Sequence, residues 1–271
     1  MPAFDVATVG DNCIDRYAAP LGLSFVGGNA VNVAVQLAMR RPGVAYFGAV
    51  GDDAAGRRTV VSLRANDVIV EHVRVTPGVT AWTDIELDSS GERVFAFEEF
   101  GACRGYRPSA AEVELLKTLR HVHLGWLDDG GALKRALLSA GVSVSQDLSV
   151  NAASIDVRPD QLSIAFLSAA TRREAEVLAE RTLSAGAGIA VVTMGHLGSM
   201  ASDGRTLAIA DAEPVVPVDT TGAGDTFIAA FIAARLERRD LQAALDAGRT
   251  AAAATCLHYG GFPQSGEPAE A

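Results

Sequence analysis

Lysine, cysteine and aromatic residues are scarce in this sequence of 271 residues. Its three cysteines, Cys13, Cys103 and Cys256, lie far apart and form no C-x-x-C pair. Isolated cysteines of this kind provide no spacing for a zinc site and are typical of reduced thiols in the cytoplasm. Aromatic residues make up only 6% of the chain against 49% hydrophobic residues, which favours helices packed closely on a buried parallel sheet over an aromatic-rich β-sandwich.

The absence of three common motifs narrows the enzyme classes. Only two lysines, Lys117 and Lys134, are present, and neither follows a glycine-rich loop, which excludes a P-loop nucleotide site. No G-x-G-x-x-G opens a helix after a strand, which argues against a dinucleotide enzyme. No G-x-S-x-G segment occurs either, so nothing indicates a serine hydrolase.

The charge of the chain limits its partners. The formal net charge of -10 argues against general affinity for nucleic acid or for an anionic membrane surface. No run approaches about 18 apolar residues, and the N-terminal segment has no basic signal-peptide region. We therefore expect a cytoplasmic protein with one domain over residues 1–262 and a disordered tail over residues 263–271, which are rich in Pro, Ser, Glu and Ala.

Hydrophobic periodicity predicts alternating strands and helices. Residues 4–10 and 44–50 are typical of buried strands, and residues 31–39 and 54–65 are typical of helices. The alternation returns later in the chain, with strands expected at 122–125, 142–146, 164–167 and 189–193 and long helices at 224–237 and 241–258. This order predicts an α/β fold in which a doubly wound, mostly parallel sheet is flanked by helices.

One segment breaks this alternation. Residues 80–97 alternate between apolar and polar side chains around a turn at 88–91, as in a β-hairpin with one exposed face. We expect this hairpin to lie apart from the parallel sheet, in a small β lid made by about residues 14–25 and 79–99. Its residues Trp82, Phe95 and Phe97 either stack on a substrate or pack between lid strands or at a dimer interface.

The strongest chemical signal is the segment Asp219-Thr-Thr-Gly-Ala-Gly-Asp225-Thr-Phe227, which opens a predicted helix. Gly222, Ala223 and Gly224 allow a ligand to approach the backbone, and N–H groups at a helix N-terminus attract a phosphoryl group. An adjacent Asp225 can accept the proton of an alcohol that attacks phosphorus. The alternative is that Asp225 only stabilises the N-terminus of the helix.

These nine residues resemble the C-terminal motif of the ribokinase-like (PfkB) carbohydrate kinases. Three further segments are similar to motifs of that family and follow in the family's order: Gly27-Gly-Asn-Ala-Val-Asn32, Gly51-Asp-Asp-x-x-Gly56 and Val191-Val-Thr-Met-Gly-His-Leu-Gly198. The resemblance covers about residues 4–262 and implies a ribokinase-like fold with ATP-dependent phosphotransferase activity.

The resemblance also implies roles for single residues. Asp225 would be the base, beside an anion hole formed by Gly222, Ala223 and Gly224. The residues that bind the sugar would be Asp15, Gly28, Asn29 and Asn32. The residues that line the ATP site would be Thr193, Gly195, Gly198 and, near the adenine, Gly261.

The same resemblance implies cofactors and partners. Glu174 would act on Mg²⁺ through water, while Asp219 and Thr221 belong to a loop where many relatives bind a monovalent cation such as K⁺. The expected partners are a sugar and ATP, without nucleic acid or membrane. We also expect a homodimer formed through the lid.

Two departures from the family pattern bear on function. The run Thr171-Arg-Arg-Glu174 stands where the family often carries Asn-x-x-Glu near Mg²⁺ and phosphate, so the glutamate is kept and the amide is lost. Asn29 stands where ribokinase-type members usually carry lysine, which removes a cation from the sugar pocket.

With Gly10-Asp-Asn-Cys-Ile-Asp15 and the terminal Tyr259-Gly-Gly-Phe262, the pattern looks most similar to family members that phosphorylate fructoselysine on a primary hydroxyl. The alternatives are a specificity for ribose or fructose and a ligand-binding regulator that has lost turnover.

Overall fold

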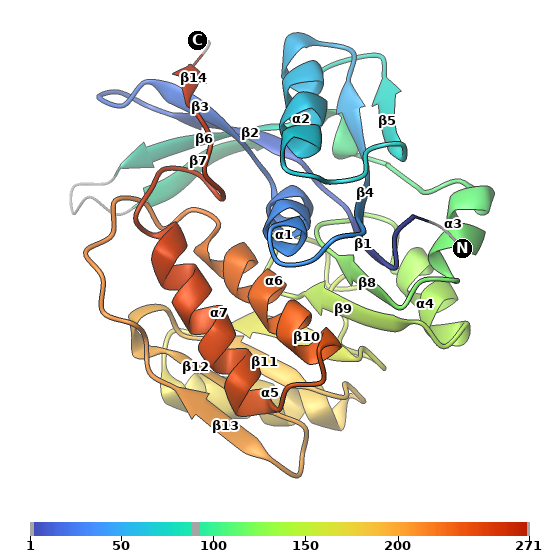
Figure 1. Cartoon of the computed structure of the whole chain (residues 1–271), viewed down its shortest axis with the longest axis vertical. Coiled ribbons are helices and arrows are strands. Elements are labelled where there is room, and N and C mark those ends of the chain that lie inside the picture. The colour runs from blue at the N-terminus through green and yellow to red at the C-terminus, as the bar shows by residue number, and fades with distance from the viewer. Residues whose placement is uncertain (1–2, 88–92, 270–271) are drawn as a thin grey trace.

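The structure is a computed structural model and describes residues 3–87 and 93–269. A large sheet forms the centre of the molecule, with helices on both faces, and a second, smaller sheet projects from it (Figure 1). The strands of the large sheet are β1 (Val6–Val9), β4 (Val44–Gly51), β5 (Val73–Thr76), β8 (His121–Leu124), β9 (Ser143–Asp147), β10 (Ile164–Ser168), β11 (Ala190–Thr193), β12 (Ser199–Ser202) and β13 (Leu207–Ala210). Their spatial order is β13-β12-β11-β10-β9-β8-β1-β4-β5.

In this spatial order, the strands from β11 across to β5 run parallel to one another. Strands β12 and β13 are antiparallel additions at one edge. Val6 of β1 pairs with Val44 of β4 on one side and with His121 of β8 on the other. β1, β4 and β8 consist entirely of buried residues, as expected for parallel strands covered on both faces.

Helices cover both faces of the large sheet. Packed against one face are α1 (Asn29–Ala38), α2 (Ala54–Ala65), α6 (Ala223–Leu236) and α7 (Leu241–Thr255). The other face is covered by α3 (Ala110–Leu116), α4 (Ala132–Ser139) and α5 (Arg172–Ser184). Helix α6 is apolar around most of its circumference because it lies between α7, α1 and the sheet, and Figure 1 shows α6 and α7 side by side.

The smaller sheet is the lid. Its strands are β2 (Cys13–Tyr17), β3 (Leu23–Gly27), β6 (Trp82–Leu87), β7 (Arg93–Glu99) and the short β14 (Glu267–Pro268), in the order β14-β3-β2-β6-β7. One face packs Tyr17 against Phe25 and Ile85, whereas Arg16 on the opposite face covers the ring of Trp82. The structure thus contains the β lid that the alternating pattern predicts, although the turn 88–91 lies outside the described residues.

The C-terminal segment differs from the expectation of a disordered tail. The side-chain amide of Gln264 donates to the carbonyl of Val26 and accepts from its N–H, at 2.8 and 2.9 Å. Glu267 then pairs with Ser24 in β3 and forms an ion pair with Arg58 of α2. The polar composition that predicted a tail instead supplies hydrogen bonds to the edge of the lid.

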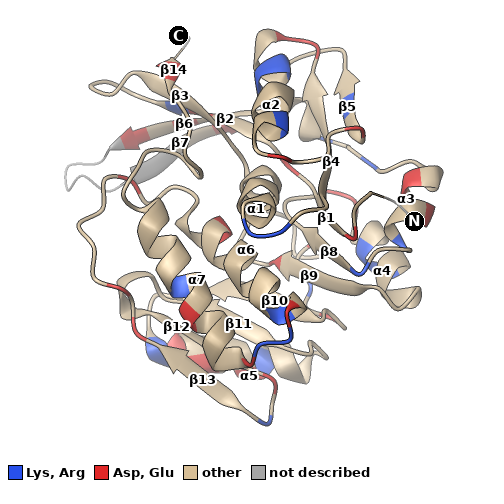
Figure 2. Cartoon of the chain, in the orientation of Figure 1, with Lys and Arg blue, Asp and Glu red and all other residues tan. Residues whose placement is uncertain are grey.

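In the view of Figure 2, the positions of lysine and arginine are scattered over several helices and loops. No helix in the described part of the chain has the length and apolar composition that crossing a membrane requires.

Candidate functional site

The candidate site lies where β1 and β9 end and where α1 and α6 begin. The carboxyl ends of parallel strands meet at one edge of the sheet, so Asp11, just beyond β1, and Asp147, the last residue of β9, lie on the same edge. The N-termini of α1 and α6 bring Asn29 and Asp225 to them. Strands and helices therefore place the carboxylates of Asp11, Asp147 and Asp225 around Asn29.

Two asparagines hold the carboxylate of Asp225. The Asn29 side-chain amide donates to Asp225 Oδ1 at 2.7 Å and to Asp147 Oδ2 at 2.8 Å. The Asn32 amide, almost one helical turn later, donates to Asp225 Oδ2 at 2.7 Å. Because both oxygens of Asp225 accept a hydrogen bond, the plane of its carboxylate is fixed.

The environment makes Asp225 a stronger base than an ordinary aspartate. Burial raises the pKa of Asp225 to about 8, and the negative charges of Asp147 and Asp11 add to that rise against the opposing hydrogen bonds of Asn32 and Asn29. Burial also raises the pKa values of Asp11 and Asp147. A carboxylate with a pKa near neutrality is suited to accept a proton from an alcohol.

Asp11 is a site residue that the sequence argument missed. Its carboxylate accepts the backbone N–H groups of Asn29 at 2.8 Å, Ala30 at 3.3 Å and Trp126 at 3.0 Å. It therefore fixes the start of α1 to the segment that follows β8. The sequence signal that could have identified Asp11 is its position directly after a buried strand and a glycine.

The predicted sugar-binding residues lie in lid strand β2 and where β3 passes into α1. Asp15 is buried in β2, where its carboxylate accepts the S–H of Cys13 at 3.2 Å, and Cys13 pairs with Gly27 of β3. A Cβ atom on Gly27 would lie 2.2 Å from an Asp15 carboxylate oxygen, so a larger residue there would displace that carboxylate. Gly28 has a φ of 99° and connects β3 directly to Asn29.

The residues predicted to form an anion hole lie at the N-terminus of α6. Gly222 has a φ of 71°, and a Cβ atom there would lie 2.3 Å from the Cα of Gly261, so this position requires glycine. The N–H of Ala223 donates to the carbonyl of Thr220 and closes the turn. A Cβ atom on Gly224 would meet no atom within 4 Å, so open space lies beside this residue.

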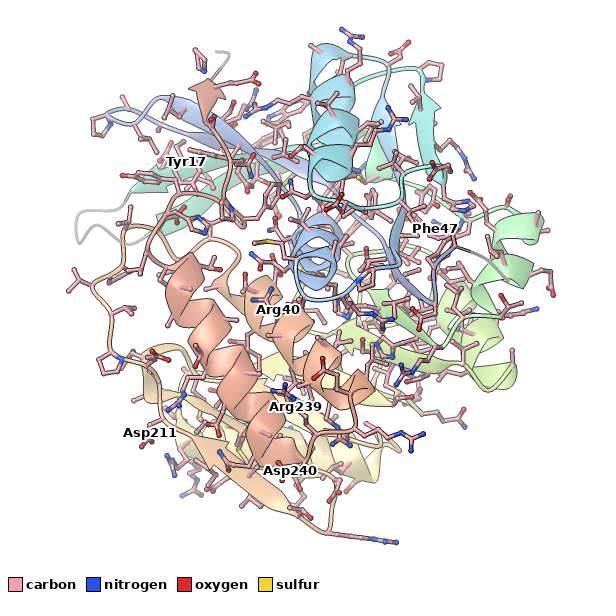
Figure 3. The ribbon with its side chains drawn as sticks, in the orientation of Figure 1. Tyr17, Arg40, Phe47, Asp211, Arg239 and Asp240 are labelled. Carbon is pink, nitrogen blue, oxygen red and sulfur yellow. The ribbon has the colours of Figure 1, made fainter. Side chains whose placement is uncertain are left out.

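A tyrosine of the lid reaches the loop before α6. The hydroxyl of Tyr17 lies 2.6 Å from Asp219 Oδ2 and 2.8 Å from Thr221 Oγ1. Asp219 also accepts the backbone N–H groups of Thr221 and Gly260. Figure 3 shows Tyr17 on the lid sheet, on the side of the C-terminal half of the chain, so this side chain connects the lid to the loop that opens α6.

The residues predicted for the nucleotide lie farther along the same sheet edge. Thr193 ends β11, Gly195 begins the short 3-10 helix η2 (Gly195–Leu197), and Gly198 follows it, with φ angles of 55° for Gly195 and 93° for Gly198. Glu174 lies in the first turn of α5, where its carboxylate accepts the N–H of Ala170 at 2.9 Å.

Thr171 and Gly261 have structural roles that the motifs did not indicate. Thr171 is the N-cap of α5, and its hydroxyl accepts the N–H of Glu174 at 3.2 Å, so the residue that departs from the family pattern performs a capping function. Gly261 packs against Gly222 and Asn32, and its carbonyl accepts the side-chain amide of Gln36 at 2.8 Å. The contacts of Gly261 therefore lie on the Asp225 side of the site.

Comparisons with known proteins agree with this geometry. The family "pfkB family carbohydrate kinase" matches residues 23–265. The chain is similar to fructoselysine 6-kinase of Shigella flexneri, with 35% identity over 95% of this chain and 99% of that protein. It is also similar to the fructosamine kinase FrlD of Bacillus subtilis, with 30% identity over 94% of this chain and 91% of that protein.

A solved structure gives the same architecture. Ribokinase of Arabidopsis thaliana, complexed with ribose and ATP, superposes with a TM-score of 0.83 over 96% of this chain and 94% of that chain, at 23% sequence identity. The fold predicted from the sequence, ribokinase-like α/β, is therefore confirmed.

Proposed function

The chain belongs to the PfkB family of carbohydrate kinases and is a phosphotransferase with an alcohol group as acceptor, and we propose that it phosphorylates a primary hydroxyl of a sugar amine, with fructoselysine as the preferred substrate. The observation that carries the proposal is the carboxylate of Asp225, held through both oxygens by Asn29 and Asn32 at the N-terminus of α6.

Asp225 acts as the base in this mechanism. Its carboxylate accepts the proton of the sugar hydroxyl while that oxygen forms a bond to the γ-phosphorus of ATP and the bond from phosphorus to the bridging oxygen of ADP breaks. Asn29 and Asn32 keep the carboxylate in position, and the open space beside Gly224 leaves room for the transferred group. The partial positive charge at the N-terminus of α6 stabilises the negative charge of that group.

Magnesium fits the nucleotide side of the site. Mg²⁺ usually keeps several waters and binds through one or two carboxylates plus substrate phosphates, and it would neutralise charge on the phosphates. Glu174 is exposed in the first turn of α5, so its carboxylate is available to hold waters of the ion. Neither Lys117 nor Lys134 provides an alternative cation, because Lys134 is engaged by Gln146 and by backbone carbonyls and Lys117 pairs with Glu114.

For the loop Asp219 to Thr221 we propose that the chain's own donors replace a monovalent cation. Asp219 Oδ2 accepts both the Tyr17 hydroxyl and the Gly260 N–H, while Oδ1 accepts the Thr221 N–H. A cation at Oδ2 would have to displace these donors. The loop is thus held in place without K⁺, which differs from what the family resemblance implies.

The choice of a sugar amine rests on the charge of the pocket. Asn29 contributes an amide where a lysine would repel a cationic amine, and it contacts the carboxyl groups of Asp11, Asp147 and Asp225. A neutral amide at Asn29 spares an ammonium group on the substrate the repulsion of a lysine, a difference of about 1 kcal/mol or more at a few ångströms. The relatives named for fructoselysine and fructosamine support the same choice.

A comparison of substrates tests this proposal. We expect kcat/KM for fructoselysine, at saturating Mg·ATP, to exceed the values for fructose and ribose by severalfold, because discrimination is a ratio of these constants. A higher value for ribose or fructose would identify a different sugar kinase. Complete absence of turnover with all of these sugars would favour the non-catalytic, ligand-binding alternative.

We also propose that the protein is a cytoplasmic homodimer formed through the lid. The rings of Trp82 and Phe97 lie 6.3 Å apart on the lid face opposite Asp15, and Phe97 is 52% exposed. A second copy of the chain packed on this face would bury both rings. Light scattering that gives the monomer mass at all concentrations would contradict the dimer.

The three free cysteines are consistent with a reducing compartment such as the cytoplasm.

A further inference from the structure

The inner face of the lid carries a carboxylate that none of the motifs includes. Thr83 of β6 pairs with Asp15 of β2 on one side and with Glu98 of β7 on the other. Residues directly opposite each other in neighbouring strands project from the same face of a sheet. Glu98 therefore lies on the same lid face as Asp15, about 10 Å away, since neighbouring strands are about 4.8 Å apart.

Glu98 connects the lid to the segment that follows β9. The side-chain amide of Asn151 donates to Glu98 Oε2 at 2.9 Å, and the carbonyl of Asn151 accepts the indole N–H of Trp126 at 2.9 Å. Asn151 follows Asp147 by only a few residues along the chain. Asp147 thus lies at the base of the site beside Asn29, while Glu98 and Asn151 lie at its outer rim.

Aromatic rings adjoin this pair. Phe100, directly after β7, stacks on Trp126 with ring centroids 4.2 Å apart, and the backbone N–H of Trp126 donates to Asp11. Arg16, a nearby cation of the lid, is turned to the opposite face, where it pairs with Asp84. The guanidinium of Arg104 lies 5.5 Å from the centroid of the Phe100 ring and Trp126 is buried, so the group that the rim leaves open is the exposed carboxylate of Glu98.

We propose that Glu98 binds the ammonium group of the substrate and selects sugar amines over neutral sugars, an inference that rests on the proposed function. When the primary hydroxyl lies at Asp225, the opposite end of the sugar, which bears the amine, points away from the floor of the site. There the ammonium donates to Glu98 in a charge-assisted hydrogen bond, alongside Asn151. A neutral sugar offers only a hydroxyl there, which can donate a hydrogen bond to Glu98 but forms no ion pair with it.

The variant Glu98→Gln tests this role. Glutamine keeps an acceptor for Asn151 but loses the charge, so we expect kcat/KM for fructoselysine and for 1-amino-1-deoxyfructose to fall about fivefold, while kcat/KM for fructose stays within twofold. Raising the salt concentration should reduce the difference between the unchanged protein and the variant, because Glu98 is exposed.

Glu99→Gln is the matched control. Glu99 pairs with Trp82, so it projects to the opposite lid face, and its carboxylate accepts the N–H of Gly101 at 3.0 Å. This variant removes the same charge one residue away and should leave both kinds of substrate unaffected. Equal effects of the two variants would mean that the overall charge of the lid, and not Glu98, is responsible.

The outcomes separate the inference from the proposed function. If the unchanged protein prefers fructose to 1-amino-1-deoxyfructose, the proposed substrate class and the role of Glu98 are both wrong. If it prefers the amines and Glu98→Gln keeps that preference, only the role of Glu98 is wrong. Thermal unfolding of each variant confirms that the exposed substitution leaves the fold intact.

Discussion

At the scale of single residues, Asp225 determines the chemical step. Asp225→Asn should lower kcat by about three orders of magnitude or more with little change in ATP affinity, because it removes a positioned base. In the unchanged protein, kcat/KM for the sugar should rise with pH and level off above an apparent pKa of about 8, the value to which burial raises Asp225. A profile that is flat between pH 6 and 9 would contradict Asp225 as the base.

The same raised pKa affects stability. Between the ordinary pKa of 3.8 and the folded value of about 8, the folded chain holds a proton on Asp225 that the unfolded chain releases. The contribution of the Asp225 carboxyl group to the free energy of unfolding is therefore fully present below about pH 3.8. This contribution is lost as the pH rises through about 8. Asp225→Asn should raise the unfolding temperature at pH 9 more than at pH 6, as measured by calorimetry. An equal change at both values would refute this linkage.

The sequence predicted Asp225 because the motif that surrounds it is local. It did not indicate that Asp147 and Tyr17 belong to the same site, since Asn29 and Asp147 lie 118 residues apart and Tyr17 and Asp219 lie 202 residues apart. Such contacts depend on which strand ends meet at the sheet edge. The residues next to an isolated aspartate or tyrosine in the sequence do not indicate which strand ends will be its neighbours in the fold.

At the scale of elements, the start of α6 depends on one glycine more than on its neighbour. Gly222→Ala should destabilise the fold by about 2–4 kcal/mol, because the left-handed backbone disfavours a Cβ atom and that atom would overlap Gly261. Gly224→Ala is the control and should stabilise the helix by about 0.5–1 kcal/mol, since its Cβ atom meets nothing. Denaturant unfolding measures both, and equal destabilisation would contradict this reading of the turn.

Tyr17 gives a second prediction at this scale. Tyr17→Phe removes the hydroxyl that joins β2 to Asp219, so kcat should fall about fivefold while KM for the sugar changes little. In the unchanged protein, kcat should be equal in K⁺ and in tetramethylammonium salts, and in the variant K⁺ should restore part of the rate. Severalfold activation of the unchanged protein by K⁺ would support the cation loop of the family resemblance instead.

Strong periodicity allowed most elements to be predicted. The expected helix at 54–65 matches α2, and the apolar run from 224 matches α6 within one residue at each end. The antiparallel pair β12 and β13 was missed because neither strand is a continuous run of large apolar residues: Ser199–Ser202 begins and ends with serine, and Leu207–Ala210 is half alanine. The place of this pair in the sheet is set by the pairing of β12 with β11, and the residues of β12 alone do not indicate that pairing.

At the scale of the whole molecule, the C-terminal segment supports the lid. A chain that ends at Pro263 loses both hydrogen bonds between Gln264 and Val26, and it loses the pairing of β14 with β3, the strand that ends at Gly27 beside Asp15. KM for the sugar should therefore rise severalfold, with a smaller effect on KM for ATP. A chain that ends at Ala269 is the control, and unchanged kinetics in the shorter chain would show that the segment is dispensable for binding.

The overall architecture followed from the order of strands and helices and from the motifs, but the course of the C-terminal residues did not. Composition alone favoured disorder for 263–271. It could not reveal that Gln264 would find both the N–H and the carbonyl of Val26, which lies 238 residues earlier.

The stack of Phe100 on Trp126 also gives the molecule an intrinsic fluorescence signal for movement of the lid. The chain has two tryptophans, and Trp82 belongs to the lid whereas Trp126 follows β8 of the main body. Phe100 is joined to β7 of the lid, so any movement of the lid changes the surroundings of the Trp126 indole. In a Trp82→Phe variant, the emission of Trp126 alone would follow lid movement during a stopped-flow reaction, without an attached dye.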